Sequence, residues 1–273
     1  MKTLGNRLVH THDTCHATGM TPQLAQIYAT GYAGQTKVAD CIDPEEGRFL
    51  ASLIANNPVR RVLEIGCAHG ISSLWIAGAL KGREGAYHVI FDPFQDSDWN
   101  GEGRRQLKIG GYGDSELYQN GSEFELPEYV NAKYCYIRDG GDGRKVSFDL
   151  IFVDGCHQFD HKLVDCFYAA RLLPISGLLV IDDTDHPQIA RVVDYIRALG
   201  FFEVAGCVAS EPRPQSLKHR LAKVLIGAVP AKLRRKVIHP ALLRRLFEPE
   251  CRMMAFRKTV EDKRPWNWGP EGF

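Results

Sequence analysis

The chain has 273 residues, which is enough for one large α/β domain with additions or for two small domains. It is 44% hydrophobic and 25% charged, as ordinary globular proteins are, and its formal net charge of +1 gives no overall electrostatic case for binding nucleic acid. No apolar run reaches the roughly 20 residues that a membrane span needs. The first residues also lack the apolar centre of a signal peptide.

The eight cysteines show no CxxC spacing, so a zinc site is not expected. Several cysteines lie in apolar patterns, where a reduced cysteine is a small core residue. We therefore expect a reducing, cytoplasmic setting. The first 40 residues include His10, His12, Cys15 and His16, for which we favour a polar, loosely ordered leader over a metal site.

The first regular element is a helix expected after Asp43, a candidate N-cap, with Pro44 at its first position. From Arg61 onward, strand patterns and helix patterns alternate along the chain. We expect strands at 61–65, 86–91, 148–153, 177–181, 201–208 and 251–257, and helices at 71–80, 159–173 and 187–199. This alternation predicts an α/β fold with a mostly parallel sheet that is covered by helices on both faces.

The stretch 93–147 is rich in glycine and acidic residues and is less regular. A helix is expected at 99–109. A third strand fits 116–120, just before Ser122, or alternatively 133–137, and we favour the first position.

Basic residues dominate the segment after Pro212, and no acid occurs between Glu211 and Glu248. Lysine and arginine interleave there with leucine, valine and isoleucine, which predicts one or two basic amphipathic helices inserted before the last strand. Because the apolar residues can serve the fold, we favour helices that pack on a second subunit or cover the substrate pocket. Attachment of residues 213–246 to an anionic membrane surface remains the less favoured alternative.

A glycine turn joins the strand at 61–65 to the helix at 71–80, with Gly66 and Gly70 at its two ends. Glycine permits positive φ there and lets the backbone approach a ligand, and the helix N-terminus offers unpaired N–H groups. The spacing G-x-A-x-G is a weak pattern by itself, and a merely structural turn stays open.

Two acids beside this turn make the pattern more specific. A carboxylate inside a buried strand is costly without a partner, and a ligand with a positively charged amino group would supply one for Glu64. Asp92 ends the next strand, where a carboxylate can accept hydrogen bonds from both hydroxyls of a ribose. S-adenosylmethionine has the ammonium group and the ribose and no pyrophosphate, so it fits better than NAD. An NAD-dependent oxidoreductase on a similar sheet remains an alternative.

Asp154, Asp182 and Asp183 follow the expected ends of two further strands. Helix capping by Asp183 would explain one of them. Three carboxylates at the edge where open α/β sheets bind ligands suit a hard cation such as Mg²⁺ or Mn²⁺. A non-catalytic cofactor-binding protein stays open, although it would not need all three acids.

Four motifs carry a resemblance to a known family, and they are VLEIGCAHGISS, VIFDPFQ, FDLIFVDGCHQF and GLLVIDDT. On these motifs, residues 42–257 resemble class I S-adenosylmethionine-dependent methyltransferases. More narrowly, they resemble the cation-dependent O-methyltransferases of the catechol, caffeoyl-CoA and macrocin types. The resemblance implies a Rossmann-like sheet with an antiparallel last strand. It also implies methylation of a hydroxyl on a small-molecule acceptor, such as a secondary metabolite or a sugar-like compound.

The resemblance also implies roles for individual residues. Asp92 would bind the ribose of the cofactor, and Ser122 or nearby backbone would contact its adenine. The remaining cofactor-binding residues, around the methionine part, would be Glu64, Gly66, Cys67, Ala68, Gly70 and Ser72. Ala68 stands where many members carry glycine, and we expect binding to tolerate it.

The resemblance further implies that Asp154, Asp182 and Asp183 bind the metal. His157 lies where catechol-type enzymes carry the basic residue that deprotonates the substrate hydroxyl, and imidazole can do this near neutral pH. We expect residues 1–41 to form a leader or lid, 42–208 with 251–260 the methyltransferase domain, and 209–250 a basic helical insertion.

Overall fold

The computed structural model describes residues 20–30, 41–113, 115–141, 147–210, 217–230, 233–234, 237–238, 240–248, 250–265 and 267–269. The histidines and the cysteine of the predicted leader, at positions 10–16, lie outside these ranges. Within them, every helix is too short or too polar to cross a lipid bilayer.

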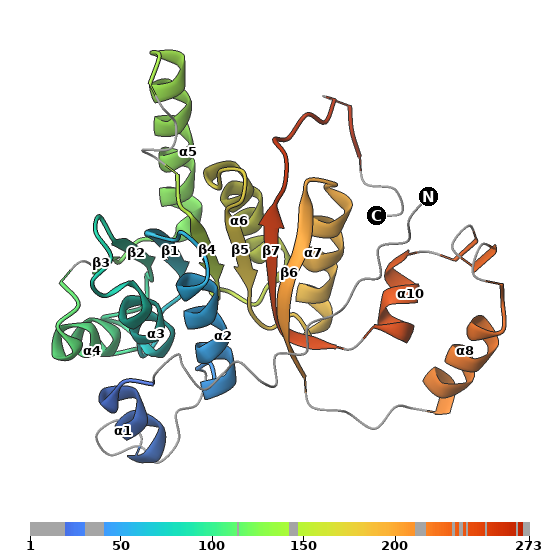
Figure 1. Cartoon of the computed structure of the whole chain (residues 1–273), viewed down its shortest axis with the longest axis horizontal. Helices are drawn as coiled ribbons and strands as arrows, with labels where there is room; N and C mark the ends of the chain where they lie inside the picture. The colour runs from blue at the N-terminus through green and yellow to red at the C-terminus, as the bar shows by residue number, and fades with distance from the viewer. Residues whose placement is uncertain are drawn as a thin grey trace.

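A seven-stranded sheet forms the centre of the molecule (Figure 1), with the strand order β3-β2-β1-β4-β5-β7-β6. The strands are β1 (Arg61–Ile65), β2 (Tyr87–Phe91), β3 (Ser115–Tyr118), β4 (Leu150–Val153), β5 (Leu178–Ile181), β6 (Phe202–Ala209) and β7 (Cys251–Lys258). β1 to β5 pair in parallel, and β7 is antiparallel to both of its neighbours. This confirms the prediction of a mostly parallel sheet with an antiparallel last strand.

Helices cover both faces of the sheet. The helices are α1 (Pro22–Thr30), α2 (Pro44–Ala55), α3 (Ile71–Leu80), α4 (Glu102–Gly110), α5 (Ser122–Arg138), α6 (Phe159–Leu172), α7 (Pro187–Ala198), α8 (Leu217–Gly227) and α10 (Pro240–Phe247). One apolar core joins α1, α2 and α3 to one side of the strands, and a second core joins α5, α6 and α7 to the other side. The two cores explain why the central strands are buried on both faces.

The third strand lies at the favoured position, because β3 pairs with β2 directly before Ser122. The alternative at 133–137 is wrong, since those residues belong to α5. The long helix α5 was not predicted at all.

The start of the chain agrees only in part with its prediction. The N-cap of α2 is Asp43, whose side chain accepts hydrogen bonds from the backbone N–H groups of Glu45 and Glu46, as predicted. Part of the segment expected to be a loose leader instead forms α1, a helix with Leu24 fully buried. Tyr28 of α1 accepts a hydrogen bond of 3.1 Å from the Trp75 ring, which fixes α1 against α3.

The carboxyl ends of six strands share one edge of the sheet. β1 to β5 are parallel, and β6 runs the same way because both β5 and β6 are antiparallel to β7. The site residues predicted from the strand ends therefore lie along one edge. The segment 210–250 also leaves and re-enters the sheet at this edge, since it joins the end of β6 to the start of β7.

Candidate functional site

The turn after β1 requires glycine at both of its ends. Gly66 and Gly70 each have φ of +85°, in the left-handed region. A Cβ atom on Gly66 would lie 2.4 Å from the backbone oxygen of Asp154, and one on Gly70 would lie 2.8 Å from Cα of Gly103. Both glycines therefore lie close to the protein's own backbone, and the approach of this turn to a ligand stays a prediction.

Glu64 is fully buried and has its partners inside the protein. Its carboxylate accepts hydrogen bonds from Ser72 Oγ at 2.5 Å and Ser73 Oγ at 2.7 Å, and its Oε2 lies 3.0 Å from Nε2 of His88. The other ring nitrogen of His88, Nδ1, lies 3.1 Å from Oγ of Ser115. The premise that Glu64 needs a ligand as its partner is thus wrong, because two hydroxyls and an imidazole compensate its burial. Contact of Glu64 and Ser72 with a cofactor stays a prediction.

Asp92 is also buried, and it connects β2 to the turn. Its Oδ2 accepts hydrogen bonds from the backbone N–H groups of Cys67 at 3.0 Å and Ala68 at 2.7 Å and from the Gln95 side chain at 3.1 Å. Its Oδ1 accepts one from Phe94 N–H at 3.0 Å. The acid expected to bind ribose therefore also holds the turn in place, and its Oδ1 keeps room for a further donor.

Ser122 begins α5 and donates a 2.6 Å hydrogen bond to Asp165 of α6. Burial raises the pKa of Asp165 to about 6, although the Ser122 hydroxyl and Lys162 act in the opposite direction. The hydroxyl of Ser122 is thus engaged within the protein, and its contact with adenine stays a prediction.

A carboxylate–imidazole cluster lies beyond the ends of β4 and β5. One ligand atom from each of Asp154, His157 and Asp183 lies within 4.8 Å of the other two. His157 Nε2 is 2.6 Å from Asp183 Oδ2, and His186 Nδ1 is 3.9 Å from Asp183 Oδ1. Of the three predicted metal ligands, two fall in this cluster together with the predicted base. Asp182 is the neighbour of Asp183 and is only 7% exposed.

The pKa values of the three acids are shifted in different directions: those of Asp154 and Asp182 are raised, and that of Asp183 is lowered. Burial raises the pKa of Asp154 to about 7 and raises that of Asp182 well above its usual range. Burial also acts to raise the pKa of Asp183, but the hydrogen bond and charge of His157 outweigh it and hold this pKa below its ordinary value. The same hydrogen bond raises the pKa of His157. The hydrogen-bonded pair of Asp183 and His157 therefore lies beside two acids whose pKa is raised.

Lys162 was not anticipated from the sequence. Its side chain is fully buried on α6, and its Nζ donates to the backbone oxygen of Val153 at 3.2 Å. Its positive charge acts to lower the pKa of Asp154, Asp182 and Asp183. The spacing in the sequence could have indicated that Lys162 is buried, because it lies four residues before Cys166 and therefore on the same buried face of α6.

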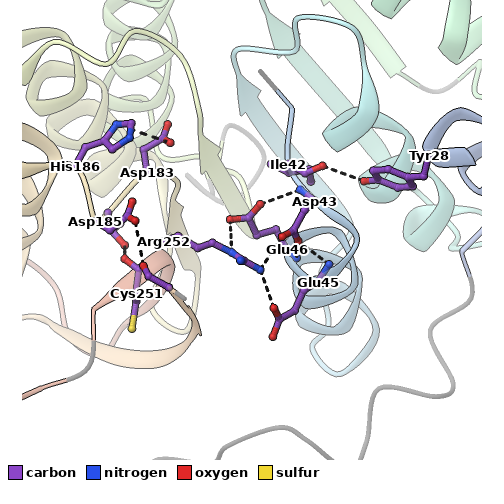
Figure 2. A network of polar contacts seen from close by, with 12 residues as sticks. Tyr28, Ile42, Asp43, Glu45, Glu46, Asp183, Asp185, His186, Cys251 and Arg252 are labelled. Atoms are coloured by element: carbon purple, nitrogen blue, oxygen red, sulfur yellow. Dashed lines mark hydrogen bonds and ion pairs between the residues drawn. The ribbon is translucent and has the colours of Figure 1, made fainter. Parts of the chain in front are cut away.

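A network of ion pairs joins the start of α2 to the start of β7 (Figure 2). Arg252 is the second residue of β7. Its guanidinium contacts Asp43 at 2.8 Å, Glu45 at 2.7 Å and Glu46 at 2.9 Å. Thr184 lies just after Asp183, and its N–H donates to the backbone oxygen of Arg252 at 2.8 Å. The turn with Asp182 and Asp183 is therefore fixed to β7, and β7 is fixed to α2.

The profile of a family described as a methyltransferase domain matches residues 63–184, which include the glycine turn and the acids after β2, β4 and β5. These residues are therefore similar in sequence to a methyltransferase domain. No curated protein matches the sequence.

The domain is similar in fold to solved O-methyltransferases. One is TomG from Streptomyces achromogenes, solved with SAM, at 17% identity and a TM-score of 0.57 over 89% of this chain and 92% of that chain. Another is the O-methyltransferase from Bacillus cereus, solved with SAH, at 17% identity and a TM-score of 0.55 over 81% and 84%. The cofactor-bound protein Rv0187 from MTB gives 20% identity and a TM-score of 0.52 over 71% and 86%. These similarities confirm the predicted Rossmann-like methyltransferase fold.

Proposed function

We propose that the protein transfers a methyl group from S-adenosylmethionine to a hydroxyl oxygen of a small molecule. The main support is that the glycine turn lies directly beside the carboxylate–imidazole cluster. Asp154 N–H donates to the Ile65 backbone oxygen at 2.8 Å, and a Cβ on Gly66 would meet the Asp154 backbone. Methyl transfer needs a donor and an activated oxygen in contact, and this adjacency provides for both.

In this proposal the turn binds the cofactor. Asp92 binds the ribose through its less occupied oxygen, while Gly66, Cys67, Ala68 and Gly70 present backbone to the ligand. The hydrogen bond from Ser72 to Glu64 holds the start of α3 against the end of β1, and these are the two elements that the turn joins. Ser122 begins α5 shortly after the end of β3, where we expect the adenine.

We further propose that the cluster binds a divalent cation. Closely spaced carboxylates suit Mg²⁺ and Mn²⁺, and Asp154 and Asp183 would hold the ion with help from Asp182. A bound cation supplies positive charge that lowers the pKa of a substrate hydroxyl. The high pKa of Asp154 and Asp182 supports this assignment, because such closely spaced acids are most stable as carboxylates when a cation neutralises them.

His157 is the proposed general base. Because Nε2 is bonded to Asp183, the neutral ring carries its proton there and leaves Nδ1 able to accept the hydroxyl proton. Asp183 thus orients the imidazole, in the way that a carboxylate orients a catalytic histidine in other enzymes. The products are a methyl ether and S-adenosylhomocysteine.

The cofactor is tested by calorimetry with S-adenosylhomocysteine and, separately, with NAD. We expect S-adenosylhomocysteine to bind with micromolar affinity, or about −8 kcal/mol, and NAD not to bind. Binding of NAD alone would favour an oxidoreductase. A protein that binds S-adenosylhomocysteine but never transfers its methyl group would be a non-catalytic binding protein.

The cation is tested by titrating the purified protein with Mn²⁺ and following the free ion by electron paramagnetic resonance. Asp154→Asn should weaken binding at least tenfold, whereas Asp160→Asn, an exposed acid at the start of α6, should not change it. With an acceptor in hand, EDTA should stop turnover and Mg²⁺ or Mn²⁺ should restore it, with Ca²⁺ less effective. His157→Ala should slow the chemical step by about 10²–10⁴-fold. Full activity in EDTA would exclude the metal-assisted mechanism.

A further inference from the structure

The helix α8 carries an apolar stripe that is exposed in the part of the chain that the structure describes. The exposed side chains are Leu217 (80%), Leu221 (58%), Val224 (68%) and Leu225 (61%). At 100° per residue these four positions span an arc of about 100° on one face of the helix. The sequence alone favoured packing of such residues within the fold or its subunits, but in the described part of the chain they face outward.

The opposite face of α8 turns toward the protein. Ala222 and Ile226 are half-buried, and the Gly227 backbone comes near the Phe247 ring of α10. α10 is itself fixed to the domain, because Arg244 makes two hydrogen bonds to Asp194 of α7 and Leu246 is buried. α8 therefore has a defined inner side, which leaves its apolar stripe as the outer side. Figure 1 shows α8 beyond α10, at the right margin and away from the sheet.

Cations flank the apolar stripe on both sides. At the same 100° per residue, Lys218 lies just beyond one border of the stripe and Arg220 lies beyond the other, whereas Lys223 lies on the opposite face with its ammonium over the Phe247 ring. All three are exposed. The chain has no acid between Glu211 and Glu248, yet its formal net charge is only +1, so the remainder is net negative. The positive charge is thus concentrated in the segment that contains α8, and Lys218 and Arg220 bring two of its charges to the borders of the stripe.

We propose that α8 attaches the protein to the surface of an anionic lipid membrane. An apolar stripe bordered by Lys and Arg is the arrangement of helices that lie in the plane of a bilayer surface, with the aliphatic side chains among acyl chains and the cations at lipid phosphates. A second copy of the chain would bring Lys218 and Arg220 close to the same cations of its partner. A nucleic acid would bind the cations but would leave four aliphatic side chains in water.

The attachment has a consequence for the candidate active site. The segment that contains α8 leaves the sheet after β6 and returns at β7, on the edge where Asp154 and Asp183 lie. A membrane-bound α8 is therefore linked to the sheet at this edge rather than at the opposite one.

The test is flotation of the full chain with vesicles of phosphatidylcholine alone or of an equal mixture with phosphatidylglycerol. We expect binding to the anionic vesicles only, and weaker binding as salt is raised. The double variant L221Q/V224Q removes apolar contact without changing charge and should bind at least tenfold more weakly. The variant K218Q/R220Q should bind roughly 25-fold more weakly, at about fivefold per charge. The control I109Q/I175Q, at residues 59% and 51% exposed on other parts of the surface, should bind as the wild type does.

Four results would overturn the proposal. They are no flotation at low salt, equal flotation with neutral vesicles, unchanged binding of L221Q/V224Q, and binding to RNA with no binding to vesicles. Light scattering identifies a fifth: a wild-type dimer that L221Q/V224Q dissociates, in the absence of vesicle binding, would assign the stripe to a second copy. Circular dichroism of each variant checks that the fold is retained, and the control double variant covers nonspecific effects of the added amides.

Discussion

The Asp92 carboxylate accepts a hydrogen bond of 2.7 Å from the backbone N–H of Ala68, so the acid that ends β2 holds the turn that follows β1. Ala68 has φ of +45°, a conformation that residues other than glycine rarely adopt. The same carboxylate oxygen accepts from Cys67 N–H, and together the two bonds compensate the strained backbone. Asp92 is therefore a structural residue of the turn, whatever it binds on its other oxygen.

Replacing Asp92 should test both roles of this acid. Asp92→Ala leaves the two turn N–H groups without their acceptor, at about 1–3 kcal/mol each, so the free energy of unfolding in urea should fall by roughly 2–6 kcal/mol. Asp92→Asn keeps an acceptor oxygen and should cost about 1 kcal/mol. If Asp92 also binds ribose, Asp92→Asn should weaken S-adenosylhomocysteine binding tenfold or more in calorimetry. Asp96→Asn, an exposed acid of the same loop, is the control. Equal affinity in Asp92→Asn would remove the ribose role.

Gly66 offers a second test of the turn, because it has a matched control in Gly82. Both have positive φ, but a Cβ on Gly66 would lie 2.4 Å from the Asp154 oxygen, whereas one on Gly82 would meet nothing within 4 Å. Gly82→Ala should therefore cost only the conformational penalty of about 1–2 kcal/mol. Gly66→Ala should cost at least twice as much and should also displace the Asp154 loop. Urea unfolding measures both, and similar losses would show that the clash is relieved without cost.

The sequence predicted which acids lie at the carboxyl edge of the sheet, but it did not predict which side chains they contact there. Asp92, Asp154 and Asp183 could be placed together because parallel strands bring their carboxyl ends to one edge. The pairing of His157 with Asp183 could not, since it depends on the φ of +58° at Asp183, which no local pattern indicates. The partners of Glu64 were also hidden, because His88 reads as one more residue of a buried strand. α5 was missed because Pro127 and mixed polarity obscure its helical period.

The buried acid Asp165 accepts a hydrogen bond from the Ser122 hydroxyl, and its ionisation should make the stability of the fold depend on pH. Burial raises the pKa of Asp165 from 3.8 to about 6, so the folded state binds its proton more tightly than the unfolded state does. Between these two values, stability must fall as pH rises, by about 3 kcal/mol in total for this group. Asp165→Asn keeps an oxygen for the Ser122 hydroxyl and removes this loss. The stability of the variant relative to the wild type, measured in urea, should therefore increase from pH 4 to pH 7 (on the order of 3 kcal/mol). A difference that is constant with pH would contradict the raised pKa.

Arg252 and Glu46 are expected to be coupled strongly, because they meet where α2 contacts β7. Glu46 is only 7% exposed, and burial raises its pKa to about 7 even though Arg252 acts to lower it. Arg252→Met removes the guanidinium and leaves this carboxyl without its cation, so the free energy of unfolding should fall by about 3 kcal/mol.

The double variant Arg252→Met/Glu46→Gln decides whether that loss comes from the pair itself. With the carboxyl made neutral, much of the loss should be recovered, which corresponds to a coupling energy of roughly 1–3 kcal/mol in a double-mutant cycle at pH 8. The same cycle on Arg104 and Asp96, an ion pair whose side chains are 49% and 60% exposed, is the control and should give a much smaller coupling energy.

The same Arg252 variant tests what positions the acids of the proposed cation site. The backbone oxygen of Arg252 accepts the Thr184 N–H whatever its side chain is, so Arg252→Met should retain the turn that carries Asp183. Mn²⁺ affinity should therefore change less than tenfold in Arg252→Met, while it falls at least tenfold in Asp154→Asn. A large loss of Mn²⁺ binding in Arg252→Met would mean that the ion pair with α2, and not the backbone bond to β7, sets the position of the acids.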